Sequence, residues 1–408
     1  MKKPFRIVLL ALALLLAAPA GAWAAWRASL LTCGPGEEIY ALYGHTALRL
    51  CNDETGDDRV YNYGMFNFDK PHFVWRFVLG QTDYELGVQN FDRFVYAYYY
   101  EGRSVVEQEL NLTPQEAERL YTLLEENYRP ENRVYRYNFL YDNCTTRAVA
   151  MLERAIDGRL VLPAGEGDKT FRDIIHEFSA GSPWDKAGQD LLIGAEVDRP
   201  IDVRRQFFAP VYAMRYLSYA VIEEPDGESR QLVWHTNKLV DGPAVAGGER
   251  VLTPGLVVAL LFLAAGAACV RQWRRRRVSL VPDVVQMVLR GLSGCLIALL
   301  FFSSEHPAVD SNWLLLLLNP LPLLVLPVYI WRRRRGLRDL YHPVLLVLVL
   351  VFGAVWAAGV QSFQPEMIGL ALILLMQCVT AIAVERNVRK QQSAAAAPAR
   401  AAHIRDKQ

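Results

Sequence analysis

The 408-residue sequence predicts an exported α+β domain followed by an all-α membrane domain of five helices. Three observations predict this architecture: an export signal at the N-terminus, an acidic middle segment, and a basic final third that contains five apolar stretches. Residues 25–250 carry 24 Lys and Arg against 36 Asp and Glu, whereas residues 251–408 carry 17 against 7, so the net charge of +1 conceals two unlike parts. This distribution excludes a uniform soluble globule, a disordered chain and a simple basic nucleic-acid-binding protein.

Residues 1–24 have the three parts of a secretory signal peptide. Three basic residues precede an apolar run from Ile7 to Ala20, and Ala22-Trp23-Ala24 has the A-x-A form of a cleavage site. The alternative is an uncleaved anchor helix, for which the apolar run is short because a membrane span needs roughly 20 residues. In either case the acidic segment that follows is delivered outside the cytoplasm.

The last third contains five apolar stretches, each close to the length that crosses a hydrocarbon core of about 30 Å. They lie at about 252–270, 284–303, 313–331, 343–362 and 366–384. Basic clusters follow the first, third and fifth stretches, and the loops after the second and fourth contain no Lys or Arg. Placing each basic cluster in the cytoplasm satisfies the positive-inside rule and leaves the acidic segment on the outer face. We therefore predict a multi-pass protein of the bacterial inner (cytoplasmic) membrane, with a periplasmic domain at 25–250, a transmembrane domain at 251–391 and a disordered cytoplasmic tail at 392–408.

Alternating apolar and polar residues predict strands in the exported domain. Residues 46–50 have this alternation and residues 59–64 resume it after the polar, turn-rich segment 52–58, so the pair predicts a hairpin with a long loop. Residues 105–110 predict a further strand.

Two helices are predicted from the residues at which they start. The first helix has Thr113 as its N-cap, Pro114 in its first turn and Glu116 at the capping-box position. It extends to about Asn127. The second helix opens at Asp142-Asn143-Cys144 and extends to about Ile156. Cys144 therefore lies at or just before a helix N-terminus.

The six cysteines divide between the two parts of the chain. Three lie in the apolar stretches, where an isolated thiol behaves as a small hydrophobic side chain: Cys269, Cys295 and Cys378. Cys33, Cys51 and Cys144 lie in the exported domain, and an odd number leaves at least one without an intramolecular partner. Cys33 and Cys51 flank a short strand-like segment and are candidates for a disulfide, which an oxidising compartment permits. Cys144 is then the remaining thiol.

Cys144 has the sequence context of a nucleophile. Unpaired backbone N–H groups and the positive end of a helix dipole favour a thiolate at a helix start. Cysteine catalysis also needs a histidine base and a polar group that orients the imidazole, and His45 and Asn62 on the predicted hairpin are the candidates. The residues alone leave open that Cys144 and His45 are structural and never meet.

Other polar residues have two interpretations each. Asp142 and Asn143 cap the helix or act in catalysis, Arg147 forms a salt bridge or binds a phosphate, and Tyr43 packs or lines an oxyanion site. Glu305 and His306 lie in a loop on the outer face at the end of a membrane span, where ionisable groups are often functional. They are candidates for binding a lipid head group or an acceptor amine.

Four segments of the sequence resemble one known family. The segments LLTCGPGEEIYALYGHTALRL, YNYGMFNFDKPHFVWRFVLGQTDYELG, LNLTPQEAERLYTLLEENYRPENRVYRYNFLYDNCTTR and EHPAVDSNWLLLLLNPL are similar to blocks of the Lnb-type lipoprotein N-acyltransferases. The motifs YGHTALR and YDNCTTR, which contain His45 and Cys144, are the most specific of these. The resemblance implies a permuted papain-like (NlpC/P60-like) fold for the exported domain, in which the histidine strand precedes the cysteine helix, as His45 precedes Cys144.

The resemblance also implies an activity. Cys144 would attack a phospholipid ester with His45 as general base, and the acyl group would pass from the thioester to the N-terminal amine of a lipid-modified lipoprotein. The implied partners are the phospholipid donor, the lipoprotein acceptor and the membrane, with no nucleic acid, no cofactor and no metal. Two alternatives stay open: a papain-like hydrolase (a cell-wall peptidase or amidase, or a phospholipase), and a non-catalytic membrane-anchored binding protein.

Overall fold

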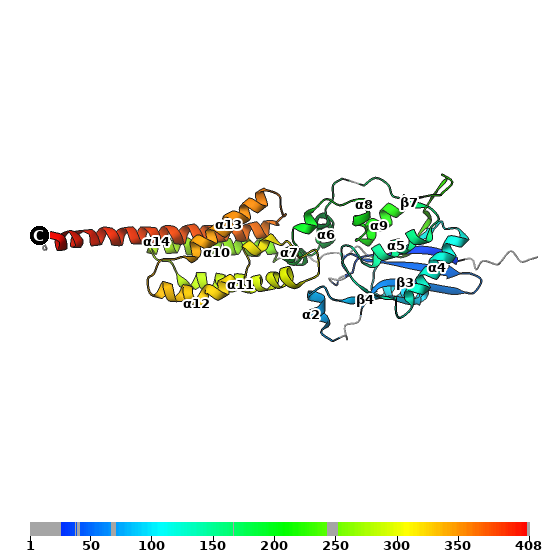
Figure 1. Ribbon diagram of the computed structural model, residues 1–408, viewed down its shortest axis with the longest axis horizontal. Helices are drawn as coiled ribbons and strands as arrows, with labels where there is room; N and C mark the ends of the chain where they lie inside the picture. The colour runs from blue at the N-terminus through cyan, green and yellow to red at the C-terminus, as the bar shows by residue number, and fades with distance from the viewer. Residues whose placement is uncertain are drawn as a thin grey trace, which may run out of the picture. The chain divides into compact units, whose positions relative to one another are not determined.

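The computed structural model describes residues 26–36, 38, 41–66, 71–165, 167–242 and 252–405 (Figure 1). The predicted signal peptide lies outside the described residues. Contacts divide the chain into two compact units, which we call the sheet unit and the helical unit. The sheet unit comprises Met1–Lys70, Asp83–Gly167 and Asp202–Val245, and the helical unit comprises Pro71–Thr82, Asp168–Ile201 and Ala246–Gln408.

The sheet unit is built on a seven-stranded sheet in which each described pair of neighbouring strands is antiparallel. The strand order is β10-β5-β1-β2-β3-β4-β6. The bounds of these strands are β1 Trp26–Cys33, β2 His45–Asn52, β3 Asp57–Met65, β4 Asp83–Asn90, β5 Val105–Leu110, β6 Val134–Arg136 and β10 Val233–Val240. A second sheet has the order β7-β8-β9, formed by Arg159–Val161, Val221–Glu223 and Ser229–Gln231.

Helices cover both faces of the large sheet. They are α3 Phe91–Tyr100, α4 Pro114–Tyr128, α5 Cys144–Ala155 and α9 Pro210–Leu217, and α8 Val203–Gln206 packs against α9. Phe94 of α3 packs in a core cluster with residues such as Leu31 and Ala47, which face one side of the pleated sheet. On the other side, Thr46 of β2 contacts Thr145 of α5, and Gln108 of β5 contacts Met214 of α9.

The predicted elements of the exported domain are confirmed. β2, β3 and β5 match the three predicted strands, and α4 and α5 match the two predicted helices to within a residue or two at their ends. The capping box of α4 forms as expected: Thr113 Oγ1 accepts from the Glu116 N–H at 3.2 Å, and Glu116 Oε2 accepts from the Thr113 N–H at 2.8 Å. Local sequence signals therefore set these boundaries.

The candidate disulfide between Cys33 and Cys51 is wrong. In the β1–β2 hairpin Cys33 lies opposite His45, whereas Cys51 lies opposite Arg27 at the other end. Six residues of extended strand separate the two positions by about 20 Å, and a disulfide needs Cα atoms no more than about 7 Å apart. Both cysteines are free thiols.

The helical unit contains the apolar helices of the last third of the chain. They are α10 Pro254–Arg275, α11 Leu280–Ser303, α12 Leu321–Arg334, α13 Tyr341–Ala357 and α14 Pro365–Arg405, with the 3-10 turn η2 Trp313–Leu316 before α12. α10 and α13 both pack against α14, and α11 packs against α12 (Figure 1). Residues 392–405, predicted to be disordered, continue α14, because alanine has the highest helix propensity of the amino acids.

The five predicted spans correspond to these helices with two differences. Among the described residues four helical segments are long and apolar enough to cross a membrane, and α13 is an apolar helix of 17 residues that ends before the turn at Gly359. The third span is interrupted between η2 and α12 rather than continuous. The interrupted segment packs against α11 at Gly294. An added Cβ there would lie 2.2 Å from the Asn319 carbonyl carbon, so this close approach requires glycine.

Four short elements that precede residue 250 also belong to the helical unit. They are α2 Phe73–Val78, α6 Phe171–Ser179, α7 Pro183–Leu192 and η1 Ala195–Asp198. The sequence-based boundary at residue 250 does not anticipate this grouping, because it follows composition and not contacts.

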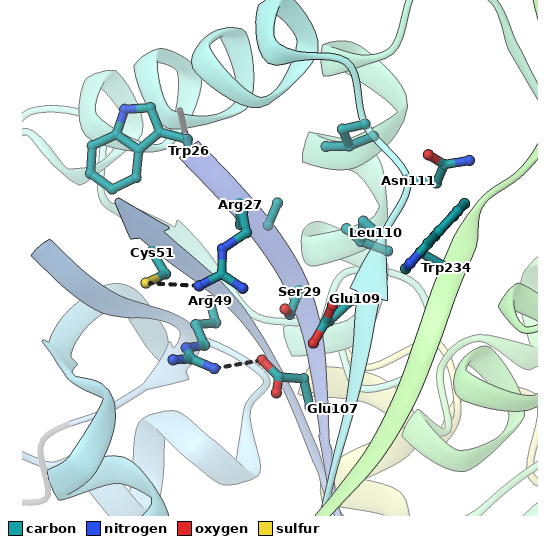
Figure 2. A pocket seen from close by; sticks show the side chains of 12 residues that line it. Trp26, Arg27, Ser29, Arg49, Cys51, Glu107, Glu109, Leu110, Asn111 and Trp234 are labelled. Carbon is teal, nitrogen blue, oxygen red and sulfur yellow. Dashed lines mark hydrogen bonds and ion pairs between the residues drawn. The ribbon is translucent and has the colours of Figure 1, made fainter. Parts of the chain in front are cut away.

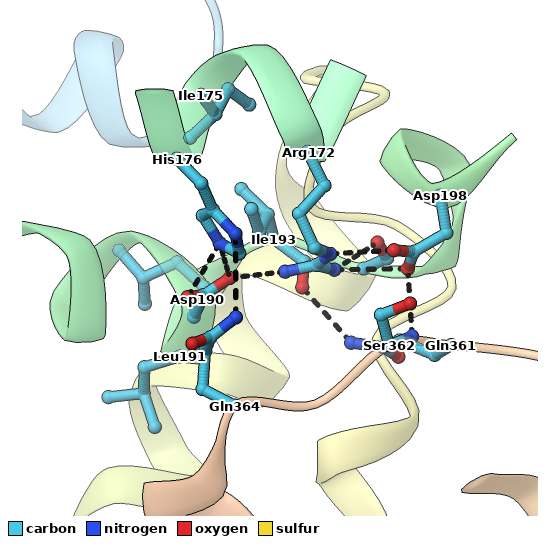
Figure 3. Close-up of polar contacts among 12 residues, drawn as sticks. Arg172, Ile175, His176, Asp190, Leu191, Ile193, Asp198, Gln361, Ser362 and Gln364 are labelled. Carbon is cyan, nitrogen blue, oxygen red and sulfur yellow. Dashed lines mark hydrogen bonds and ion pairs between the residues drawn. The ribbon is translucent and has the colours of Figure 1, made fainter. Parts of the chain in front are cut away.

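A buried polar network holds α6, α7 and η1 together (Figure 3). Arg172 of α6 is 4% exposed, donates to Asp198 Oδ1 at 2.7 Å and forms a buried ion pair with Asp190. His176 Nε2 lies 2.9 Å from both carboxylate oxygens of Asp190. The guanidinium therefore neutralises carboxylates that could not be buried alone.

The same network binds the loop between α13 and α14. Gln361 Nε2 donates to the Ile193 carbonyl at 3.2 Å, and the Ser362 N–H donates to Asp198 Oδ2 at 3.2 Å. These bonds join residues more than 160 positions apart and attach the α6–η1 segment to the apolar helices.

We predict that Arg172→Met destabilises the full-length protein by about 3–5 kcal/mol, because it leaves two carboxylates without their main cationic partner. Denaturant titration of the purified protein in detergent measures this. The matched control is Arg199→Met, which removes an exposed pair with Glu196 and should cost about 1 kcal/mol or less. Equal effects of the two substitutions would show that the Arg172 network does not stabilise the fold.

Candidate active site

The start of α5 is fixed by the side chain of Asn143. Its Oδ1 accepts hydrogen bonds from the N–H groups of Thr145 at 2.9 Å and Thr146 at 3.0 Å, and Thr146 Oγ1 accepts from the Asn143 N–H at 2.8 Å. Its Nδ2 donates to the carbonyl oxygens of Phe139 and Phe208, both at 2.8 Å. Cys144 is the first residue of the helix, as the sequence predicts, and its side chain is buried.

His45 is positioned by the first residues of β2. Gly44 precedes it with φ +83°, and an added Cβ there would lie 2.3 Å from the Cys33 carbonyl oxygen, so only glycine fits this approach. The imidazole Nε2 lies 3.2 Å from Asn62 Oδ1 on the neighbouring strand β3. Asn62 Nδ2 donates to the Val60 carbonyl at 3.4 Å, which leaves Oδ1 as the acceptor for the histidine.

The thiol of Cys144 and the imidazole of His45 are close enough that each changes the pKa of the other. Burial raises the pKa of Cys144, but the charge of His45, with hydrogen bonds from His45, the Thr46 backbone and Thr145, outweighs burial and brings the pKa below its usual range. Burial lowers the pKa of His45, but the Cys144 thiolate and the hydrogen bond to Asn62 raise it above its usual value. Together these shifts favour a thiolate–imidazolium pair.

The arrangement depends on contacts that the sequence alone did not indicate. Thr46 Oγ1 lies 2.9 Å from Thr145 Oγ1 and joins β2 to α5 directly beside the pair. Gly64 lies at a register shift of β3 next to Cys144 and has φ +88°, a backbone conformation that favours glycine. Tyr135 has a buried hydroxyl that makes no hydrogen bond within the described residues, and burial raises its pKa. Because these residues come from separate elements of the chain, no local sequence pattern predicts that they meet.

The residues around Cys144 differ in role. Asn143 is the helix cap, as expected, but the capping interpretation of Asp142 is wrong because its carboxylate binds Arg147. Arg147 donates to Asp142 from Nε at 2.6 Å and from Nη2 at 2.7 Å, and its guanidinium stacks 3.6 Å from the Tyr135 ring centroid. The salt-bridge interpretation of Arg147 is thereby confirmed. Tyr43 is buried and packs edge-on against Phe139.

Glu305 and His306 are held in the helical unit by contacts with α2 and the residues that directly follow it. Gln81 Nε2 donates to Glu305 Oε1 at 3.1 Å, and His306 Nε2 lies 3.2 Å from the Phe77 carbonyl oxygen. Both side chains therefore support a neighbouring segment of the chain.

A separate cavity of about 280 Å³ lies on the sheet unit (Figure 2). Its lining comes from β1, β2, β5 and β10 and includes Trp26 and Trp234 but neither Cys144 nor His45. Arg49 and Glu107 form an ion pair of 2.8 Å within it, so their charges offset one another. The cavity is not part of the Cys144 site.

The fold and the site define a membrane protein whose α+β domain carries a cysteine–histidine pair. Residues 23–177 match the Lnb N-terminal periplasmic domain, and residues 247–389 match the five-helix Lnb transmembrane domain. The chain belongs to the Lnb family, as its sequence motifs suggested. No curated protein and no solved structure matches it. It is accordingly a multi-pass membrane protein with an N-terminal periplasmic domain.

We predict that Cys144 reacts with iodoacetamide near neutral pH, because His45 stabilises its thiolate. Burial raises the pKa of Cys51, so Cys51 should label only at higher pH and serves as an internal comparator. In His45→Ala the positive charge is lost, so burial dominates the pKa of Cys144 and raises it. Labelling of Cys144 should therefore move to higher pH. Peptide mass mapping across a pH series measures each site separately. An unchanged pH dependence of Cys144 labelling in His45→Ala would contradict the coupling.

Proposed function

We propose that this Lnb-family protein is a cysteine-dependent lipoprotein N-acyltransferase. It would move a fatty acyl group from a phospholipid, through a Cys144 thioester, to the N-terminal amine of a lipoprotein. The observation that carries the chemistry is the Cys144–His45 pair at the start of α5, with Asn62 against the imidazole. The acceptor is proposed from family resemblance.

In the first half-reaction Cys144 Sγ attacks the ester carbonyl carbon of the phospholipid. A C–S bond forms, the C–O bond to glycerol breaks, and His45 gives its proton to the departing alkoxide, which leaves as a lysophospholipid. The Cys144 N–H is the first-turn amide that Asn143 does not engage, and we assign it as a donor to the oxyanion of the tetrahedral intermediate.

In the second half-reaction the neutral α-amine of the acceptor attacks the thioester carbonyl. His45, now neutral, accepts a proton from the amine, a C–N bond forms, and the C–S bond breaks to restore the thiolate–imidazolium pair. The favourable charge pairing in the resting enzyme makes thiolate an adequate leaving group. No step requires a group that the chain does not itself supply.

The geometry supports a permuted papain-like relationship for the sheet unit. A cysteine at a helix start, a histidine on an antiparallel strand and an amide oxygen on the second ring nitrogen are the parts that papain-like catalysis uses. Here the histidine strand comes first in the chain, as in permuted members. The periplasmic location suits the task, because both proposed substrates are anchored in lipid.

We predict that the purified protein acquires the mass of a fatty acyl group when it is incubated with phospholipid. Hydroxylamine should remove the adduct, because thioesters are labile to it, and Cys144→Ser should carry no hydroxylamine-sensitive adduct. His45→Ala should form little adduct, since general acid–base catalysis contributes about 10²–10⁴-fold. Intact-mass spectrometry of the full-length protein in detergent measures all three.

Two results would contradict the proposal. Lysophospholipid accumulating without any adduct, even when a diacylated lipopeptide is present, would indicate a phospholipase. Absence of both adduct and lysophospholipid would indicate the peptidase or binding-protein alternatives. The control variant is Cys51→Ser, which removes a half-buried thiol remote from His45 and should leave adduct formation unchanged.

We further predict that Asn62→Ala slows acylation by about 10²-fold, the scale expected when a reacting group is misplaced by about 1 Å. Asn62→Asp retains the acceptor oxygen for His45 and should recover most of the rate. Single-turnover acylation followed by intact mass measures both variants. Because Asn62 acts through His45, its loss should also raise the pH at which Cys144 labels, which a purely structural defect would not do.

A further inference from the structure

The helix α2 exposes a cluster of large apolar side chains. It is the six-residue segment FVWRFV, and none of its side chains is buried. Val74 is 73% exposed, Trp75 is 54% exposed and Phe77 is 48% exposed. Three adjacent apolar side chains on so short a helix are costly in water, at about 25 cal/mol per Å² of apolar surface.

Hydrogen bonds fix α2 to the end of α11. The Glu305 N–H donates to the Leu79 carbonyl at 2.8 Å, and Ser304 Oγ donates to the Val78 carbonyl at 3.0 Å. These bonds occupy carbonyl oxygens at the C-terminal end of α2, which otherwise lack partners within the helix. The polar loop that follows α11 thus continues the hydrogen bonding of α2.

The chain just after α2 approaches the loop 304–306 closely at Gly80. Gly80 has φ +72°, and a Cβ on it would lie 3.0 Å from the His306 nitrogen and 3.2 Å from the Glu305 carbonyl carbon. The His306 ring packs edge-on against Phe77, with ring centroids 6.3 Å apart. Burial lowers the pKa of His306, so the ring is largely neutral at pH 7 and its Nε2–H donates to the Phe77 carbonyl.

The end of α11 lies at the outer surface of the membrane. Five arginines precede α11 or end the helix before it, whereas the loop 303–312 after it contains no Lys or Arg, so the positive-inside rule places Ser304–His306 on the periplasmic side. A segment bonded to these residues lies at the level where the helix leaves the hydrocarbon. Tryptophan is enriched at that level, because its amphipathic ring suits the head-group region.

We propose that α2 is an interfacial helix that lies in the outer leaflet, with Val74, Trp75 and Phe77 among the lipid head groups and upper acyl chains. The occupant of this surface is phospholipid, because the surface is continuous with the outer end of a membrane span. The insertion between β3 and β4 is thereby a membrane-contacting element in a domain otherwise assigned to the periplasm. This inference does not depend on the acyltransfer chemistry.

Photo-crosslinking to lipid tests the proposal in the full-length protein. p-Benzoylphenylalanine replaces Trp75 in one variant and Val74 in another, and each is reconstituted into phosphatidylglycerol–phosphatidylethanolamine vesicles and irradiated. The positive control is the same substitution at Leu324 in α12, which is 72% exposed, and the water-exposed control is at Trp234 in the sheet unit, which is 76% exposed. Intact mass counts the adducts of phospholipid mass.

The expected result is a phospholipid adduct at positions 74 and 75 at a yield similar to that at 324 and about tenfold or more above that at 234. A yield at both positions no higher than at 234 would overturn the proposal. Protein–protein adducts in place of lipid adducts would also overturn it and would identify a protein as the occupant. Because both substituted side chains are exposed, loss of folding does not confound the measurement, and retained Cys144 labelling in each variant confirms that the sheet unit is intact.

Discussion

The Asn143 side chain is the constraint on which the site depends. One amide makes four short hydrogen bonds, two to N–H groups of α5 and two to carbonyl oxygens at Phe139 and Phe208. A helix start would otherwise be free to fray, and the position of its first residue would vary with it. Here the cap is hydrogen-bonded to two other segments of the chain, so Cys144 keeps one position relative to His45. The Asn143 side chain does not engage the Cys144 N–H, which can therefore donate to a substrate.

Burial alone does not explain the chemistry of Cys144. Cys33 is also fully buried in the sheet unit, and burial raises its pKa, an effect that the neighbouring Tyr98 and Arg103 do not reverse. Cys144 differs because His45 supplies a positive charge and Thr46 and Thr145 supply hydrogen bonds. Excluding water strengthens the attraction between the Cys144 thiolate and the His45 imidazolium, but it also raises the free-energy cost of an unpaired charge. A desolvated site therefore favours the ion pair only where both side chains are held in place. Gly44 and Asn62 fix the histidine.

Local signals in the sequence predicted elements of the exported domain, including those that carry the site, and long-range contacts decided how they assemble. The Thr113 capping box, the alternation after His45 and the helix start at Cys144 each depend on a few neighbouring residues, so they could be identified directly. The register of the strands could not be predicted in this way. Cys33 and Cys51 were candidates for a disulfide, but in the β1–β2 hairpin Cys33 lies opposite His45 and Cys51 lies opposite Arg27. Glu305 and His306 were candidates for ligand binding, but their partners are Phe77 in α2 and Gln81 just after it, more than 220 residues earlier, and nothing in the sequence around residue 305 indicates those contacts.

The same long-range contacts change how the two units are connected. A boundary at residue 250 implies one linker, but α2 and the α6–η1 segment both belong to the helical unit, so the chain passes between the units five times. The two inserted segments are held by polar contacts, α2 by Ser304–His306 and the α6–η1 segment by the Arg172 network. Repeated connections raise the effective concentration of one part of a chain at another more than a single flexible linker does. In the acyltransfer that we propose, donor and acceptor are both anchored in lipid, and a chain that returns to the helical unit in three segments ties the Cys144 site repeatedly to the membrane that holds them.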